Sequence, residues 1–344
     1  MIYKLDIIPF SSALVNLDLA AFIHSNGLKK GVMMSHKPPR LYEYKLKGIN
    51  ALSNEIDFIG WEECLDFVYY PFKKLIICAI KTSEDIAQLY TLDVRDYTTV
   101  STGIKIPIMF ECPRMIKSSG GQFYARTEVY QVTVYFKMDQ NLNTRILKVD
   151  LEEEDSIIAD FEPVGLNRLL IVSVDGKFSY YEFNLRMASF GKINKKERFS
   201  VRLKDGEQCN VVTMCSKAQY AGVGTLMDDG EKRRLGKLYI YHVSDFGVFE
   251  MRDVIDFNKS QYAIHDGSFF GSLTMSLYYG EYPLVFACQT EGQGMMLSFK
   301  FNGKKLIRYH SPIKLYNAKS YMMSKSGSIL TTVDYAGNIS VIKF

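Results

Sequence analysis

The chain has 344 residues, of which 47% are hydrophobic, and 42 Lys and Arg residues against 38 Asp and Glu give a net charge of only +4. This composition is sufficient for a folded core, and the charge excess is well below that of dedicated nucleic-acid-binding proteins. No uncharged apolar stretch approaches the roughly 18 residues of a membrane-spanning helix, and the N-terminus lacks a signal-peptide or transit-peptide pattern, so we expect no membrane span and a cytoplasmic or nuclear location.

From the N-terminus onward the chain repeats one pattern, a short apolar run, a turn and an alternating strand rich in aromatic residues. The 23 Tyr and 22 Phe residues, against a single Trp, suit half-buried strands of this kind. Copies of the hairpin pattern occur at residues 30–46, 74–92, 122–138, 169–183, 220–243, 283–301 and 328–344. The Asp175-Gly176 pair in the fourth copy is a strong signal for a tight hairpin turn.

Each hairpin is preceded by an apolar segment that predicts an inner strand, such as residues 64–70. Each of the first six is followed by a further predicted strand, such as residues 97–103 in the second copy and 198–203 in the fourth. Most copies are spaced close to the ~40–45 residues of a four-stranded WD-repeat blade. Two steps are longer, and we assign the excess to insertions at 187–208 and 265–282.

The last copy ends the chain and lacks a fourth strand, whereas residues 2–8 predict a strand without a hairpin of its own. Because an open sheet edge is a liability, we expect strand 2–8 to complete the last blade and close the ring. The sequence therefore predicts an all-β fold, a single seven-bladed β-propeller domain over residues 1–344. Its blades are expected to end near residues 46, 92, 138, 183, 243, 301 and 344. The alternative is a pair of β-sandwiches, which the regular spacing disfavours.

The arrangement resembles the WD-repeat propeller family over essentially the whole chain, but without the family's Gly-His and Trp-Asp dipeptides. At two of the Trp-Asp positions the chain has Thr91-Leu92 and Lys343-Phe344. Polar groups of those dipeptides tie the strands of a blade together in the family, so here we expect aromatic and aliphatic packing to replace them. Gly222-Val-Gly-Thr225 with 233–243 is similar to a strand–loop–strand signature of the damaged-DNA-binding and cleavage-and-polyadenylation factor propellers, which are large scaffolds.

The chemistry-bearing residues form no recognisable catalytic or metal-binding motif. The six cysteines form no CxxC pair, no histidine has metal-ligand spacing, and no Walker-type or GxSxG motif occurs. His265-Asp266, the one His–Asp neighbour pair, precedes Gly267 and is typical of a turn. We therefore expect no cofactor, no small-molecule substrate and no enzymatic activity. A propeller enzyme would instead require a metal or carboxylate cluster in its central channel.

Two basic groups are the candidate partner-binding residues. They are Lys192, Lys195, Lys196, Arg198, Arg202 and Lys204 in one stretch, and Lys232, Arg233 and Arg234 in the fifth hairpin. An acidic run at 152–155 is expected to be a solvated turn. The leading hypothesis is a non-catalytic protein-binding scaffold or subunit of a multiprotein complex. The alternative is an RNA- or nucleoprotein-associated propeller that uses the basic loops 192–204 and 232–234.

Overall fold

A computed structural model gives the structure of most of the chain. It describes residues 5–8, 17–25, 28–35, 39–45, 52–57, 60–70, 74–108, 115–119, 122–136, 145–151, 156–184, 189–192, 200–215, 217, 219–228, 230, 233–257, 269–276, 282–290, 295–309, 311, 313–314, 318–323, 329–334 and 339–343. All regular elements in these residues are β-strands. The described residues contain no helix long and apolar enough to cross a membrane.

Successive strands pair with their neighbours in the chain and form antiparallel four-stranded sheets. The first three sheets are β2 (Leu17–Ser25), β3 (Leu28–Ser35), β4 (Arg40–Lys45) and β5 (Leu52–Asp57); β6 (Cys64–Tyr70), β7 (Leu75–Lys81), β8 (Ile86–Asp93) and β9 (Thr99–Pro107); and β10 (Ile116–Ser119), β11 (Gln122–Glu128), β12 (Gln131–Phe136) and β13 (Arg145–Asp150). The next two are β14 (Ile158–Val164), β15 (Arg168–Ser173), β16 (Phe178–Asn184) and β17 (Ser189–Lys192); and β18 (Glu207–Met214), β19 (Tyr220–Asp228), β20 (Arg233–Val243) and β21 (Phe249–Asp256).

The remaining sheets contain the two ends of the chain. One comprises β22 (Phe269–Ser276), β23 (Leu284–Thr290), β24 (Met295–Phe301) and β25 (Leu306–Arg308), with β26 (Ile313–Lys314) also paired to β24. The other comprises β27 (Ala318–Met323), β28 (Ile329–Asp334) and β29 (Ile339–Lys343), with β1 (Leu5–Ile8) from the start of the chain antiparallel to β29. In that pair Leu5 lies opposite Ile342 and Ile8 opposite Ile339.

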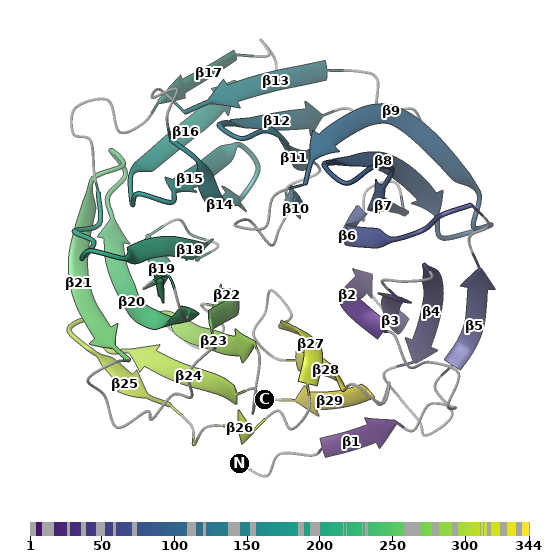
Figure 1. Cartoon of the computed structure of the whole chain (residues 1–344). Coiled ribbons are helices and arrows are strands. Elements are labelled where there is room, and N and C mark those ends of the chain that lie inside the picture. Colours follow the sequence, from purple (N-terminus) through teal and green to yellow (C-terminus); the bar gives the residue numbers. More distant parts are fainter. Residues whose placement is uncertain are drawn as a thin grey trace.

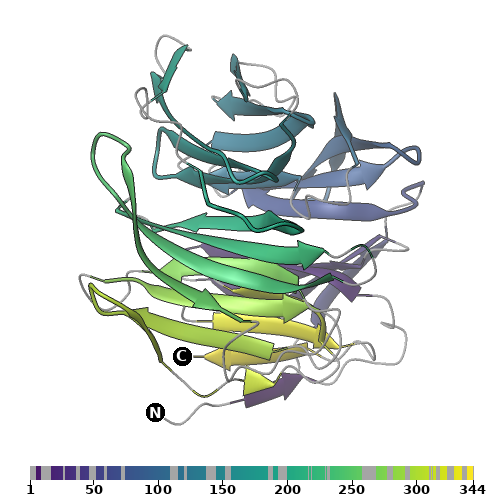
Figure 2. The same ribbon diagram turned by 60° about the vertical axis from the view of Figure 1, so that its left-hand side comes forward.

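The sheets lie side by side around a central axis, each with its first strand innermost (Figure 1). The first and last strands, β1 and β29, lie side by side in this view, as their pairing requires, and Figure 2 shows the same arrangement turned by 60°. Each expected hairpin is formed by the second and third strands of a sheet, β15 and β16 for residues 169–183. Gly176 has φ +86° in the turn between them, so the predicted Asp175-Gly176 turn is confirmed.

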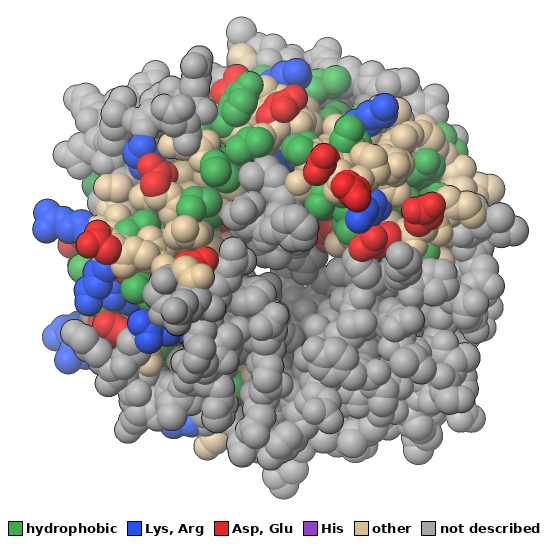
Figure 3. Space-filling model, in the orientation of Figure 1, with side chains coloured by type: hydrophobic (Ala, Val, Ile, Leu, Met, Phe, Trp, Pro, Cys, Tyr) green, Lys and Arg blue, Asp and Glu red, His purple; other side chains and the backbone are tan. Residues whose placement is uncertain are grey.

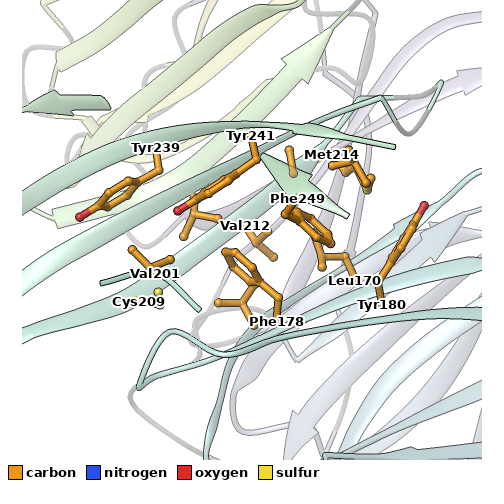
Figure 4. Close-up of a cluster of buried hydrophobic side chains, with 14 of the residues drawn as sticks. Leu170, Phe178, Tyr180, Val201, Cys209, Val212, Met214, Tyr239, Tyr241 and Phe249 are labelled. Carbon is orange, nitrogen blue, oxygen red and sulfur yellow. The ribbon is translucent and has the colours of Figure 1, made fainter. Parts of the chain in front are cut away.

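Apolar side chains fill the space between neighbouring sheets. Between sheets β14–β17 and β18–β21 the core combines aliphatic and aromatic side chains. Phe178 lies 5.4 Å from Tyr241 and 5.2 Å from Phe249, measured between ring centroids (Figure 4). Aromatic rings bury large areas and favour tilted or edge-to-face contacts of this kind. This packing joins two sheets, whereas the expected replacement of polar ties concerns the strands within one blade, so that expectation stays a prediction.

Side chains from the inner strands also join neighbouring sheets. Lys117 on β10 forms ion pairs with Asp160 (2.9 Å) and Glu162 (3.1 Å) on β14. On the other side of β10, the Ser118 hydroxyl donates to the Tyr69 carbonyl on β6 at 2.9 Å. Since these groups are largely buried, such bonds help fix the position of each sheet relative to the next.

Three expectations about the two longer spacings between hairpin copies were wrong. Residues 198–203 are not the outer strand of the fourth sheet, because β17 (Ser189–Lys192) takes that place and Ser200 makes only an isolated bridge with Lys177. The stretch 187–208, expected to be an insertion, thus contains an outer strand. Likewise 265–282 contains the inner strand β22. In both cases a Gly or Ser-rich composition concealed a strand that tertiary packing stabilises.

Candidate partner-binding surface

The first basic group lies partly within the described residues. Lys192 ends β17, where it pairs with Tyr181, whereas Lys195, Lys196 and Arg198 lie outside the described residues. Arg202 and Lys204 are exposed, and they alternate with Val201 and Leu203, which pack on the core between sheets β14–β17 and β18–β21. This alternation fixes the segment on the protein and turns both cations toward solvent.

The second basic group lies at the start of β20. Arg233 is opposite Asp228, Arg234 is opposite Met227 and exposed, and Lys232 lies outside the described residues. The N–H of Asp228 donates to the carbonyl of Gly206 at 2.7 Å, and Gly206 is two residues after Lys204. The structure therefore brings Arg202 and Lys204 to the same end of sheet β18–β21 as Arg233 and Arg234, whereas Lys192 lies on β17 of the preceding sheet.

A buried polar network lies beneath this end of the sheet. The Glu207 carboxylate, whose side chain is fully buried, accepts hydrogen bonds from the Thr225 hydroxyl (2.7 Å), the Lys237 ammonium (2.6 Å) and the Tyr239 hydroxyl (3.3 Å). Burial alone would raise the pKa of Glu207, but the hydrogen bonds from Lys237 and Thr225 outweigh it and hold the pKa below its ordinary value. The network connects three strands of one sheet. The hydrophobic pattern of the sequence did not predict it.

The network explains the signature that resembles other propellers. The Thr225 hydroxyl accepts the N–H of Lys237 at 2.8 Å, at a register shift that follows Gly224. A side chain on Gly236 would place a Cβ 2.4 Å from this hydroxyl oxygen, so any other residue would force Thr225 to move. Thr225 and Lys237 of this segment thus belong to the buried network, and Gly236 leaves the room that the Thr225 side chain occupies.

A third basic group was missed. Residues 292–333 contain seven Lys and Arg residues but no Asp or Glu, a charge asymmetry that is visible in the sequence. Four of these cations, Lys300, Lys304, Lys305 and Arg308, are exposed on β24, β25 and their connecting turn, which we call the basic hairpin (residues 295–308). In Figure 3, Lys and Arg side chains gather along the left-hand edge, over the region of β20, β21 and β25, with a few acidic side chains between them.

The turn of the basic hairpin has a defined geometry. The Asn302 side-chain oxygen accepts the N–H groups of Lys304 (3.0 Å) and Lys305 (2.9 Å). Gly303 has φ +89°, and a Cβ there would lie 2.8 Å from the ring of Tyr282. The ring therefore packs directly on the turn, which presents the two lysines from a fixed backbone.

Exposed apolar side chains also lie on the outer strands β21 and β25 and on the turn before β21. Five large hydrophobic residues with substantial exposure come from β21, the turn before it and β25: Phe246 (82%), Val248, Met251, Val254 and Ile307 (52%). The two outer strands are in contact, because the N–H of Leu306 donates to the Asp253 carboxylate at 2.6 Å. Exposed apolar side chains on neighbouring outer strands are candidates for contact with another protein.

The described residues contain no group of His, Cys, Asp and Glu that could hold a metal ion. Cys64, Cys78, Cys209 and Cys215 are buried and form no disulfide, and burial raises the pKa of the Cys64 and Cys209 thiols. His242, within the described chain, packs edge-on against Tyr220. His265 and Asp266, like the acidic run at 152–155, lie outside the described residues.

Comparison with solved structures identifies the fold. The structure of U3-55K is similar over 99% of this chain and 98% of that one, with 9% identity and a TM-score of 0.65. The β-propeller domain of Cps50 (Swd1) from Myceliophteria thermophila gives 10% identity, coverage of 99% and 100% and a TM-score of 0.63. The structure of the RRP9 WD40 repeats is 9% identical, covers 98% of this chain and 97% of its own, and has a TM-score of 0.64.

The chain has a WD40-like β-propeller fold. The predicted all-β propeller class is thereby confirmed, and identities this low support the fold alone. Neither the protein-family models nor the curated protein sequences give a match to the chain.

Proposed function

We propose that this chain is a non-catalytic protein-binding scaffold or a subunit of a multiprotein complex. The observation that supports the proposal is the exposure of large apolar and basic side chains on the outer strands β21 and β25, which are in contact. A propeller has a rigid framework, so such a surface binds without a large ordering cost. One of the structural neighbours is a chain in a structure of the mitotic checkpoint complex. We infer a cytoplasmic or nuclear location for this chain.

The proposed architecture is one seven-bladed domain over residues 1–344, with blades ending near 46, 92, 138, 183, 243, 301 and 344. In this arrangement β1 closes the ring as the outer strand of the last blade, a role supported by its pairing with β29. A chain that begins at residue 9 would expose the edge of β29. It should unfold at a lower temperature and self-associate, and unchanged thermal unfolding would contradict ring closure.

The function is tested by purifying the tagged protein at physiological salt, with and without nuclease, and identifying its partners by mass spectrometry. A reproducible set of proteins that survives nuclease treatment is the expected result. A protein that elutes alone from every extract would contradict the scaffold function.

The second candidate function is association with RNA or a nucleoprotein through the basic loops 192–204 and 232–234. It is favoured by the Gly206–Asp228 hydrogen bond, which brings Lys204 and Arg234 to one end of the sheet. RNA binding should then weaken steeply with added salt and fall further in an Arg202→Glu/Lys204→Glu/Arg234→Glu variant. Lack of salt-dependent RNA binding at low ionic strength would exclude this function.

A further inference from the structure

We propose that the basic hairpin is a docking site for an extended acidic segment of a partner protein, with Lys300, Lys304 and Lys305 binding its carboxylates and Ile307 contacting an apolar side chain. The inference rests on the proposed protein-binding function and specifies the chemistry of the partner. It concerns a surface distinct from the basic loops around Lys204 and Arg234.

Three cations of the hairpin, Lys300, Lys304 and Lys305, have no ion pair within the part of the chain that the structure describes. Elsewhere on the described surface, cations such as Lys81, Lys177 and Arg252 do have acidic partners. A group of neighbouring cations without such partners attracts a ligand that carries several negative charges.

The backbone of the hairpin holds the cations in place. The Asn302 side chain fixes the N–H groups of Lys304 and Lys305, and the Tyr282 ring packs on Gly303. One exposed ion pair contributes little to the free energy of binding on its own, because its two side chains lose conformational freedom when they pair. Several lysines on one fixed backbone lose less freedom in forming the same contacts, which favours a ligand that reaches all of them.

An apolar contact accompanies the charge. Ile307 lies directly opposite Lys300 in the β24–β25 pair, so the two side chains share a face of the sheet, and Ile307 is 52% exposed. An extended peptide places alternate side chains on opposite sides, so an acidic segment with spaced apolar residues matches this arrangement.

A protein segment fits this surface better than a nucleic acid does. Proteins that bind single strands stack bases on aromatic rings, whereas Ile307, the exposed apolar residue directly opposite Lys300, is aliphatic. The Tyr282 ring, whose residue is 36% exposed, lies with its hydroxyl end against Gly303 and is therefore partly covered. We therefore assign the anionic groups of the ligand to Asp and Glu side chains.

The test is selection of random linear peptides, displayed on phage, against the immobilised full-length protein. We expect enrichment of Asp and Glu near an apolar residue. An enriched peptide should bind a Lys300→Glu/Lys304→Glu/Lys305→Glu variant at least about tenfold more weakly. Ile307→Ser should weaken binding several-fold at unchanged charge.

The matched control is Arg202→Glu/Lys204→Glu/Lys217→Glu, which reverses the same number of exposed cations elsewhere. It should bind the enriched peptide as the wild type does, and thermal unfolding verifies that both variants fold. Equal binding by all three proteins would overturn the docking site and leave the scaffold function intact.

Two further outcomes separate the alternatives. A random single-stranded RNA pool that binds the hairpin, while no peptide is enriched, would overturn the proposed ligand class in favour of nucleic acid. No enriched peptide together with no nuclease-resistant protein partner would overturn both the docking site and the scaffold function.

Discussion

Asp66 on β6 and Asp160 on β14 hold equivalent positions in two inner strands, and each binds a backbone amide of the following sheet. Both carboxylates follow a register shift in their strand. The Asp66 carboxylate accepts the N–H groups of Met115 (2.9 Å) and Ile116 (3.1 Å), and that of Asp160 accepts the N–H of Val212 (2.9 Å). A bulged inner strand thus turns a carboxylate toward the next sheet.

Asp66→Ala should lower the free energy of unfolding by about 3 kcal/mol, because it leaves buried N–H groups of Met115 and Ile116 without an acceptor. Asp66→Asn keeps one acceptor oxygen and should therefore lower the free energy of unfolding by less than Asp66→Ala does. The measurement is urea unfolding, with the exposed Asp205→Ala as a control that changes stability by less than about 0.5 kcal/mol. Equal stability of the Asp66→Ala and Asp205→Ala variants would show that the contact between sheets contributes little.

The buried ion pair between Glu207 and Lys237 should behave as a unit. Lys237→Met removes one partner and leaves a buried carboxylate unpaired, which should destabilise the protein by about 3–5 kcal/mol. The double variant Glu207→Gln/Lys237→Met removes both charges and keeps an acceptor for Thr225. It should therefore recover much of the loss in chemical unfolding, and a double variant no more stable than Lys237→Met would contradict this interpretation.

Gly236→Ala should destabilise the protein by about 2 kcal/mol or more, because the added Cβ would meet the Thr225 hydroxyl and backbone. Gly60→Ala serves as the control: Gly60 has φ +86° but open space around its Cβ, so strain alone should cost about 1 kcal/mol. Thermal unfolding of both variants separates the close contact from backbone strain. A smaller effect at Gly236 than at Gly60 would be evidence against the close approach of Thr225.

Low pH should lower the stability of the folded protein, in part through protonation of Asp93. Hydrogen bonds from the Arg95 side chain lower the pKa of Asp93 to about 2, from the ~3.9 of an unfolded chain. A lowered pKa in the folded state stabilises the protein above the unfolded value, and this contribution is lost as the pH falls from about 4 to about 2. Melting temperatures of wild type and Asp93→Asn should therefore differ at neutral pH and converge near pH ~2. A difference that persists unchanged at low pH would exclude this role.

Periodicity and turn chemistry were sufficient to predict the fold class and the hairpins, because alternation and pairs such as Asp175-Gly176 act locally. They failed where a strand is short or rich in small residues, as in β17 and β22, since packing against neighbouring sheets stabilises those strands. The Glu207 network could not be predicted, because its members are 18 and 30 residues apart in sequence and meet only across paired strands.

The candidate site was predicted only in part. Clusters of Lys and Arg in the sequence predicted Arg202, Lys204 and Arg234 as candidate residues, and these three are exposed. The cations of the basic hairpin are more widely spaced in the sequence, so a search for such clusters did not find them. The sequence signal for the basic hairpin is the lack of Asp and Glu residues over 292–333, and not a high density of Lys and Arg. The exposed apolar residues on the outer strands, such as Met251, could not be told from core residues, because exposure depends on which outer strands remain uncovered.

The most direct measurement for a protein-binding surface on the outer strands is site-specific photo-crosslinking in cells, with the photoreactive residue p-benzoylphenylalanine at position 307. The same residue at position 146 of β13 is the control, because Ile146 is 54% exposed and Ile307 is 52% exposed. We predict a nuclease-resistant cross-link to a defined partner protein at position 307 and none at position 146. Cross-links to RNA alone, or equal cross-linking at both positions, would contradict the account.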